Sequence, residues 1–295
     1  MKKVIYYLTV VCLMLLVGAS TLEAATEITS LPYTITAQGS YIINQNLKAN
    51  WHGIKVQANN VTIDLNGYSI SGNNASGGYG VYMNGCSNVE IRNGTIRNFG
   101  SRGIYEEGSS GNSHRVINVR VMNNKGSGIS LNGNNHMLKD CTISNNGGYG
   151  IYAYSGSTVS GNTSYNNGSY GISAGFGCTV SGNTSYSNGG DGISASAGST
   201  LSGNTAYNNG NYGIAASVGS TVTGNTAYAN GNDGIYAAPG CTVKNNTSYY
   251  NEEYGIYLSG YNLVDGNTAY QNNQAGGYAN MITCGTCFFG DNVAP

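Results

Sequence analysis

Short runs of alternating apolar and polar residues recur through the second half of the chain. One unit contains three of them, IYA at residues 151–153, TVS at 158–160 and TSY at 163–165. Alternation with a period of two residues is typical of a β-strand that buries one face. Clusters of Gly and Asn separate the runs, and these residues supply the positive φ angles that tight turns require. Each unit therefore predicts three short strands joined by turns.

A Gly-Ile or Gly-Val dipeptide marks each unit and reveals the period of the chain. Its successive intervals are 27, 23, 25 and 22 residues, followed by five intervals of 21. Such a fixed period is typical of a solenoid, in which each unit buries its apolar side by stacking on the next. Leu is too scarce for leucine-rich repeats, and the nine-residue period of calcium β-rolls is missing. The glycines of these dipeptides are Gly53, Gly80, Gly103, Gly128, Gly150, Gly171, Gly192, Gly213, Gly234 and Gly255.

The short sequences Gly-Ile, Asn-Thr and Asn-Asn-Gly recur in the units. They resemble the repeats of right-handed parallel β-helix proteins of the pectin-lyase-like superfamily, above all the NosD-like proteins. LPYTI at 31–35, NVTIDLNG at 60–67 and IRNGTI at 91–96 are similar to the opening coils of that family. The resemblance implies an all-β, single-stranded right-handed parallel β-helix of about ten coils of 21–27 residues, with three strands per coil. It implies little about activity, because this fold carries lyases, hydrolases, epimerases and adhesins.

The ends of the chain predict its processing and its boundaries. Lys2 and Lys3 precede an apolar run at 4–17, and small residues follow it. We interpret residues 1–24 as a signal peptide, which predicts a secreted or periplasmic protein; a retained N-terminal anchor is the alternative. The apolar run is too short for a comfortable membrane span, and no later segment approaches that length. We predict one domain, with caps at 25–52 and 271–295 around a β-helix at 53–270.

The composition of the chain is polar and Gly-rich but carries few charges. Charged residues make up 8% of the sequence, and there are 46 Gly and 3 Pro. A polar chain of this kind can be disordered, but the strict period and the regular Val and Ile positions argue for a folded solenoid. The net charge is −1, so there is no electrostatic case for a nucleic-acid partner.

Two outward columns of the third strand give the first candidate site. Large apolar residues, Ile96, Val121 and Ile143, stand where later units have Ser or Ala, so this position faces the core. Its two neighbours then face outward. We interpret them as a Tyr/Thr strip whose ring faces stack on sugars while its hydroxyls bond to them. The strip comprises Tyr165, Tyr186, Tyr207, Tyr228, Tyr249, Tyr270, Thr163, Thr184, Thr205 and Thr226.

A column of Asn precedes each third strand. Stacked side-chain amides bond from coil to coil as a ladder, so we assign these residues a structural role. The column comprises Asn162, Asn183, Asn204, Asn225, Asn246 and Asn267.

The charged residues gather in the irregular half and give the second candidate site. A lyase or epimerase acting on an acidic sugar needs a cation for the carboxylate and a base for the C5 proton. Such groups serve equally well as surface ion pairs. The chain also lacks the paired Asp of polygalacturonases, the Asp-Pro-His-Glu of alginate epimerases and the clustered Asp of pectate lyases. The candidates are Arg97, Arg102, Glu106, Glu107, His114, Arg115 and Arg120.

The cysteines and histidines do not predict a metal site or a cofactor. The three His and the Met residues are scattered, so nothing indicates copper. Cys178 and Cys241 share a column with Ser residues and lie three coils apart, so we expect small column fillers rather than a disulfide. Cys284 and Cys287 form a CxxC near the C-terminus, which we predict to be a local disulfide that stiffens the end of an exported protein.

Several functions remain open from the sequence. We favour polysaccharide or envelope-glycan binding through the Tyr/Thr strip over catalysis near residues 102–120. A structural or adhesive surface protein is the second alternative. The outward hydroxyls of the T-x-S runs at 158–160, 179–181 and 200–202 would suit ice binding, but Lys244 and Asp265 interrupt that grid. The oligomeric state is not predicted.

Overall fold

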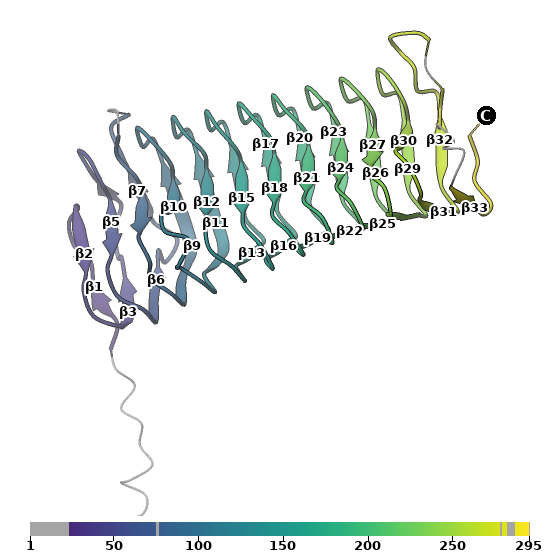
Figure 1. The fold of residues 1–295 in the computed structure, drawn as a ribbon. Helices are drawn as coiled ribbons and strands as arrows, with labels where there is room; N and C mark the ends of the chain where they lie inside the picture. The colour runs from purple at the N-terminus through teal and green to yellow at the C-terminus, as the bar shows by residue number, and fades with distance from the viewer. Residues whose placement is uncertain (1–23, 75–76, 278, 282–286, 295) are drawn as a thin grey trace, which may run out of the picture.

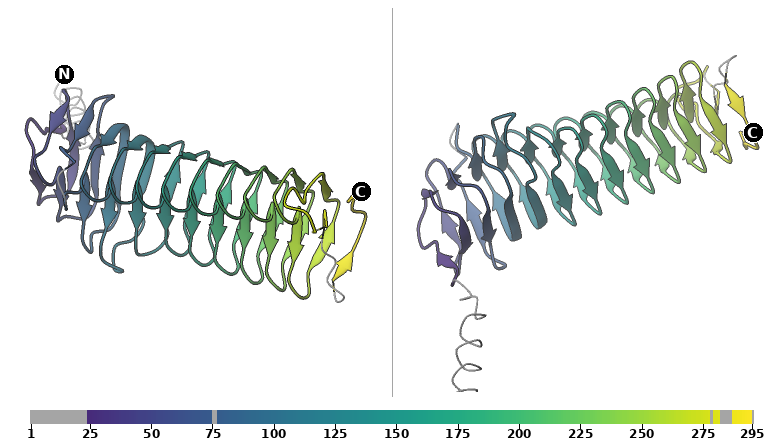
Figure 2. Two further views of the ribbon diagram at one scale, coloured as in Figure 1. Left: turned by 90° about the horizontal axis from the view of Figure 1, so that it is seen from above. Right: turned by 60° about the horizontal axis from the view of Figure 1, so that its bottom comes forward.

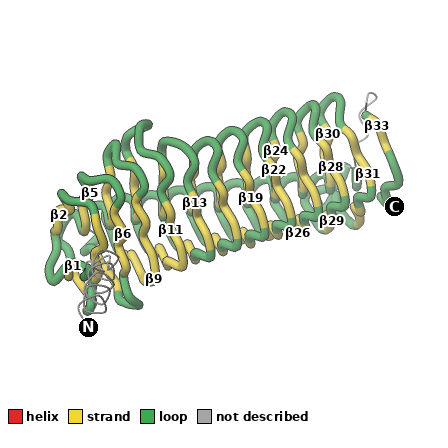
Figure 3. The backbone as a smooth tube through the Cα atoms, turned by 90° about the horizontal axis from the view of Figure 1, so that it is seen from below, coloured by secondary structure: helices red, strands yellow, loops and turns green. Residues whose placement is uncertain are grey.

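The computed structural model describes residues 24–74, 77–277, 279–281 and 287–294. These residues wind as stacked coils along one axis (Figure 1) and consist of strands and turns without a helix (Figure 3). The described part of the chain thus offers no helix of the length and apolarity needed to cross a membrane. The predicted signal peptide lies outside the described residues, except for Ala24.

Each coil contributes one strand to each of three rows, and all pairing between neighbouring coils in a row is parallel (Figure 2). The first row is an 11-stranded sheet that contains the strand after every Gly-Ile or Gly-Val. Its strands are β2 (Tyr33–Ile35), β5 (Ile54–Val56), β8 (Val81–Met83), β10 (Ile104–Glu106), β12 (Ile129–Leu131), β15 (Ile151–Ala153), β18 (Ile172–Ala174), β21 (Ile193–Ala195), β24 (Ile214–Ala216), β27 (Ile235–Ala237) and β30 (Ile256–Leu258).

The second and third rows form a 22-stranded sheet that bends around a corner. The second row holds β1 (Thr26–Glu27), β3 (Gly39–Ile42), β6 (Val61–Asp64), β13 (Met137–Lys139), β16 (Thr158–Ser160), β19 (Thr179–Ser181), β22 (Thr200–Ser202), β25 (Thr221–Thr223), β28 (Thr242–Lys244), β31 (Leu263–Asp265) and β33 (Phe288–Phe289). The third row holds β4 (Leu47–Lys48), β7 (Ser69–Ser71), β14 (Thr142–Ser144), β17 (Thr163–Tyr165), β20 (Thr184–Tyr186), β23 (Thr205–Tyr207), β26 (Thr226–Tyr228), β29 (Thr247–Tyr249) and β32 (Thr268–Tyr270). Two long strands, β9 (Val89–Arg97) and β11 (Arg115–Met122), span both rows.

One residue with a left-handed conformation makes the corner between the second and third rows. Gly161 has φ 66° in a regular coil, and Asn93 has φ 58° inside β9. Gly adopts this region without steric penalty, and Asn tolerates it better than most residues. The corner therefore needs no loop, and the two rows stay adjacent.

The bore is filled by columns of matched side chains. In the unit of β15 to β17, Ile151, Val159 and Ser164 are all fully buried. The inward assignment of these three columns is therefore correct. Cys178 and Cys241 are buried free thiols, in agreement with the column-filler prediction.

The number of coils exceeds the prediction. We predicted about ten, whereas the solenoid has about 12 turns. The first complete coil, β2 to β4, begins after Pro32 rather than at a Gly-Ile dipeptide, so alignment on that dipeptide missed it. The short β33 adds a partial turn at the other end by pairing with β31.

Hydrogen-bonded side-chain ladders tie the coils together. In the predicted ladder, Asn162 Nδ2 donates to Asn183 Oδ1 at 3.0 Å and to the Leu138 carbonyl at 2.9 Å. A second buried ladder was not predicted. It follows each third strand, and its members are Asn124, Asn146, Asn167, Asn188, Asn209, Asn230, Asn251 and Asn272.

Candidate functional site

The six tyrosines of the Tyr/Thr strip lie on the outer face of the third row. Their parallel strands hold them in register, so Tyr165 pairs with Tyr186 and each following Tyr with the next. Neighbouring ring centroids are 4.8–5.3 Å apart, and the ring planes differ by only 1–8°. The rings thus form one continuous offset stack parallel to the solenoid axis.

This stacking corrects the way in which we expected the strip to bind sugars. Tyr186 has the ring of Tyr165 on one face and the ring of Tyr207 on the other. Neighbouring rings therefore occupy the ring faces of the inner tyrosines, where we had expected sugars to stack. Burial in the stack raises the pKa values of Tyr186, Tyr228 and Tyr249, with a smaller effect from adjacent tyrosines. What the strip presents is the ring edges and the phenol hydroxyls.

The hydroxyls of the strip are available for a ligand. Thr163 and Tyr165 point outward because Ser164 between them is buried in the bore. Within the described chain, none of the six Tyr hydroxyls donates or accepts a hydrogen bond, and the Thr hydroxyls from Thr163 onward have no partner either. The strip is therefore a regular double column of unpartnered hydroxyls over six coils.

Two of the seven catalytic candidates lie inside the bore. Glu106 is fully buried at the inward end of β10, and His114 is 1% exposed. Glu106 Oε1 accepts hydrogen bonds from the amides of Gly85 and Gly108, and Oε2 lies 3.3 Å from His114 Nε2. His114 belongs to a third ladder, since its backbone N–H donates to His136 Nδ1. These two groups lie too deep to contact a polymer on the surface.

Three further candidates have protein partners on the surface. Arg115 Nε donates to Glu90 at 2.7 Å in the second row. The Arg102 guanidinium lies over the Tyr105 ring, 4.1 Å from its centroid. Glu107 accepts a hydrogen bond from the Tyr82 hydroxyl, which raises the pKa of Tyr82 to about 12.

The last two candidates, Arg97 and Arg120, lie exposed on the outer face of the third row. Arg120 borders an open cleft of about 420 Å³ at the corner of the coils, together with Asp64, Asn93 and Asn118. The seven candidates thus lie in separate places: the bore, the first and second rows, and the third row. They do not form one acid–base centre in the structure.

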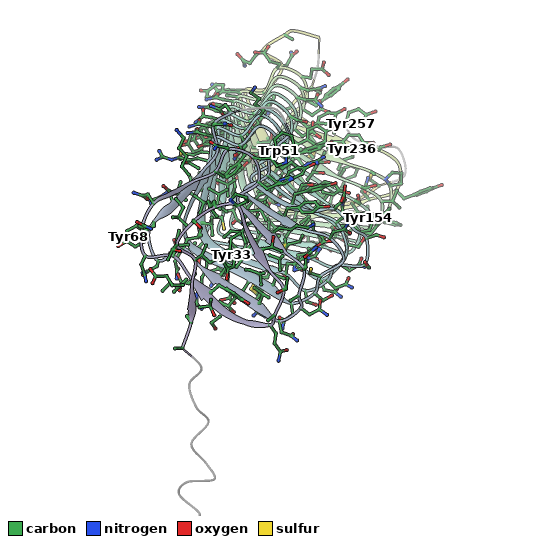
Figure 4. All side chains as sticks on the ribbon, turned by 90° about the vertical axis from the view of Figure 1, so that its left-hand side faces the viewer. Tyr33, Trp51, Tyr68, Tyr154, Tyr236 and Tyr257 are labelled. Atoms are coloured by element: carbon green, nitrogen blue, oxygen red, sulfur yellow. The ribbon has the colours of Figure 1, made fainter. Side chains whose placement is uncertain are left out.

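The outer face of the first row carries aromatic residues that the sequence did not single out. Tyr154, Tyr236 and Tyr257 lie on one side of the molecule, opposite Tyr68 (Figure 4). Tyr236 and Tyr257 stack at 5.7 Å. Alignment of the residues that follow each Gly-Ile would have revealed this column, but its interruption by Ser and Ala concealed it.

Two aspartates in the turns before the strands of the first row have raised pKa values. Asp191 and Asp233 are each 4% exposed. Burial raises the pKa of both and brings that of Asp233 to about 6. Asp233 Oδ1 accepts the backbone N–H of Tyr254 at 3.0 Å, and Asp191 accepts from Asn211 at 2.6 Å. Both carboxylates therefore bond one coil to the next.

The described residues include one cysteine of the predicted disulfide and no cluster of metal-ligating side chains. Among the described residues, no group of three or more His, Cys, Asp and Glu side chains has a metal-binding arrangement. Cys287 is disulfide-bonded. Its predicted partner, Cys284, lies outside the described residues, so the pairing stays a prediction.

The fold and the sequence together define a class of protein. A family model for the right-handed β-helix region matches residues 34–184, 80–226 and 165–292. The chain therefore belongs to the right-handed β-helix family, which confirms the resemblance seen in the repeats. No curated protein sequence matches the chain.

Solved structures with a similar fold include enzymes and a phage protein. A double mutant of the periplasmic alginate epimerase AlgG has a TM-score of 0.63 at 13% identity, covering 87% of this chain and 77% of that chain. The mannuronan C-5 epimerase AlgE6 A-module of Azotobacter vinelandii has 0.58 at 17%, covering 83% and 71%. The Dettilon tailspike protein has 0.56 at 18%, covering 91% and 59%. At these identities the likeness is one of fold.

Proposed function

We propose that this protein binds polysaccharide at its surface, outside the cytoplasm, through the Tyr/Thr strip and without catalysis. The observation that carries the proposal is the double column of unpartnered hydroxyls along six coils. A linear polysaccharide repeats a hydroxyl-rich unit along its axis, so it can bond to many identical coils at once. Each bond is weak, but linked bonds on one polymer act together.

Other features agree with this proposal. The strip is regular, because every coil from β17 to β32 has the same three-residue strand in register. AlgG and AlgE6, which share the fold, are epimerases of alginate and mannuronan, so this architecture is compatible with polysaccharide ligands. The predicted signal peptide would direct the protein to where such polymers occur.

A lyase or epimerase remains the alternative to binding. It would need an accessible base close to a cation, whereas Glu106 and His114 are buried. The exposed Glu107 is held by the Tyr82 hydroxyl, and Arg115 is paired with Glu90. Uronate polymers incubated with the protein should therefore give no unsaturated products by absorbance. An increase in that absorbance that Arg102→Ala and Arg120→Ala abolish would favour a lyase instead.

The strip itself is tested by removing hydroxyls while keeping the ring stack. We expect Tyr186→Phe with Tyr207→Phe to weaken binding in a polysaccharide panel by about threefold to tenfold, because each hydroxyl contributes about one hydrogen bond. Thermal unfolding should remain nearly unchanged, since the rings still stack.

A matched pair of substitutions on another face provides the control. Tyr236→Phe with Tyr257→Phe removes two hydroxyls from the first row and should leave affinity unchanged. Binding that survives even Tyr186→Ala with Tyr207→Ala would refute the strip as the binding surface.

A further inference from the structure

Three cations lie on the same sheet face as the Tyr/Thr strip, at its N-terminal end. The register of the third row places Arg120 in line with Thr142 and then Thr163, which is the Thr column. Arg97 lies in line with Met122, Ser144 and then Tyr165, which is the Tyr column. Lys48 pairs with Ser71, which pairs with Arg97, so Lys48 lies in the same column two coils beyond Arg97. We call Lys48, Arg97 and Arg120 the cationic end.

These cations are not neutralised by the protein. All three are exposed. The Nε of Arg120 donates to the Thr95 hydroxyl at 3.2 Å, and this leaves its terminal nitrogens without a partner in the described chain. The side chains of Arg97 and Lys48 form no hydrogen bond or ion pair with the described residues.

Nearby acids are already paired in another row. Arg92 bonds to both Asp64 and Glu90, and Arg115 bonds to Glu90, so two cations balance two anions on the second row. The outward positions of the third row, from Lys48 to Tyr270, carry no Asp or Glu in the described chain. The face that carries the strip is therefore purely cationic in its charge.

The geometry of the cationic end suits an anionic ligand group. Arg97 and Arg120 lie on adjacent strands, two positions apart, which separates their Cα atoms by about 8 Å. A guanidinium binds carboxylate or sulfate through parallel hydrogen bonds. The cleft of about 420 Å³ beside Arg120 leaves room for such a group next to the sheet. The one acid that lines it, Asp64, already accepts hydrogen bonds from Arg92 and Asn93.

We propose that the cationic end makes the strip selective for linear polysaccharides that carry carboxylate or sulfate groups. The anionic groups bind at Lys48, Arg97 and Arg120, and the rest of the polymer lies along the hydroxyls of the strip. This inference rests on the proposed function, because it assumes that the strip holds a polysaccharide. Selectivity follows because the same hydroxyls serve any polymer, whereas the uncompensated cations favour an anionic one.

The test compares three polymers with one pair of variants. Polygalacturonate, dextran sulfate and neutral dextran are titrated with the full-length protein, with Arg97→Gln/Arg120→Gln, and with Lys139→Gln/Lys244→Gln. The last variant also removes two positive charges, but from the second row, where each Lys lies near an Asp. We expect Arg97→Gln/Arg120→Gln to weaken binding to the anionic polymers about tenfold and to reduce its dependence on salt.

The outcomes separate the two proposals. Tighter binding of polygalacturonate assigns a carboxylate and tighter binding of dextran sulfate assigns a sulfate, and both support the inference. Equal binding of neutral and anionic polymers, or an equal loss in the Lys variant, overturns the inference while polysaccharide binding stands. Loss of polymer binding in the Tyr→Phe variant without any effect of the Arg variant likewise overturns the inference alone. If the unaltered protein binds none of the polymers, both proposals fail.

Discussion

At the scale of single residues, the protein buries carboxylates and supplies them with partners from neighbouring coils. Glu106 accepts two backbone N–H groups and faces His114. Asp233 accepts one N–H from Tyr254, and its burial raises its pKa from 3.8 to about 6. Because the folded-state pKa of Asp233 is raised, the folded state binds its proton more tightly than the unfolded state does. The free energy of unfolding therefore falls as the pH rises from about 4 to about 6, and the penalty is complete at pH 7.

The fall in the free energy of unfolding with rising pH gives a testable prediction for Asp233. Asp233→Asn keeps an oxygen for the Tyr254 N–H and removes the buried charge. We expect it to raise the free energy of unfolding by about 3 kcal/mol at pH 7, with the gain vanishing near pH 4. Denaturant unfolding at several pH values measures this difference. The half-exposed Asp265 provides the control, since Asp265→Asn should change little; a gain at Asp233 that is independent of pH would contradict the titration.

At the scale of the elements, ladders of side-chain amides add hydrogen bonds between coils whose strands are only three residues long. Asn204 Nδ2 donates to the Val180 carbonyl at 2.9 Å and to Asn225 Oδ1 at 3.0 Å. Its Oδ1 accepts the backbone and side-chain N–H groups of Asn183, each at 3.0 Å. One side chain therefore satisfies buried polar groups on the coil before it and the coil after it, where an unsatisfied group costs about 1–3 kcal/mol.

Removal of one ladder member tests this role. We expect Asn204→Ala to lower the free energy of unfolding by about 3 kcal/mol, because it leaves several buried donors and acceptors without partners. Asn208→Ala is the matched control four residues away. Asn208 is exposed with φ 53°, and Ala229 adopts the same φ one coil later, so this change should cost less than about 1 kcal/mol. Equal losses in the two variants, measured by urea unfolding, would argue against the ladder.

At the scale of the whole molecule, the solenoid is a nearly one-dimensional stack. From β15 to β32 each row repeats the same strand every 21 residues. Each coil contacts mainly its neighbours, so stability is close to a sum over coils and interfaces. The strip grows with the number of coils, whereas the cationic end occurs once.

Deletion of whole repeats tests this description. Removal of residues 183–224 joins Gly182 to Asn225 and restores the SGNT sequence with two coils fewer. We expect cooperative unfolding and a particle shorter by about 10 Å in solution scattering. Removal of residues 183–214 takes out one and a half coils, which shifts outward residues into the bore, so this variant should not fold. If both deletions fold equally well, the register is not what specifies the structure.

The repeating part of the protein could be predicted from the amino-acid sequence alone, because a period of 21 residues places equal residues in stacked columns whatever the exact path of the chain. The period thus predicted a solenoid of three short strands per coil, the inward Ile and Val columns and the bonding of the Asn162 ladder. The resemblance of the repeats to a known family added the right-handed parallel β-helix. The positions of residues in the non-repeating coils depend on how the coils pack in three dimensions. The opening coils differ in length, so sequence spacing alone did not assign Glu106 to the bore or Lys48 to the face of the strip. Ring orientation also depends on contacts between coils, and these turned the tyrosines of the strip into a stack that presents its edges and hydroxyls.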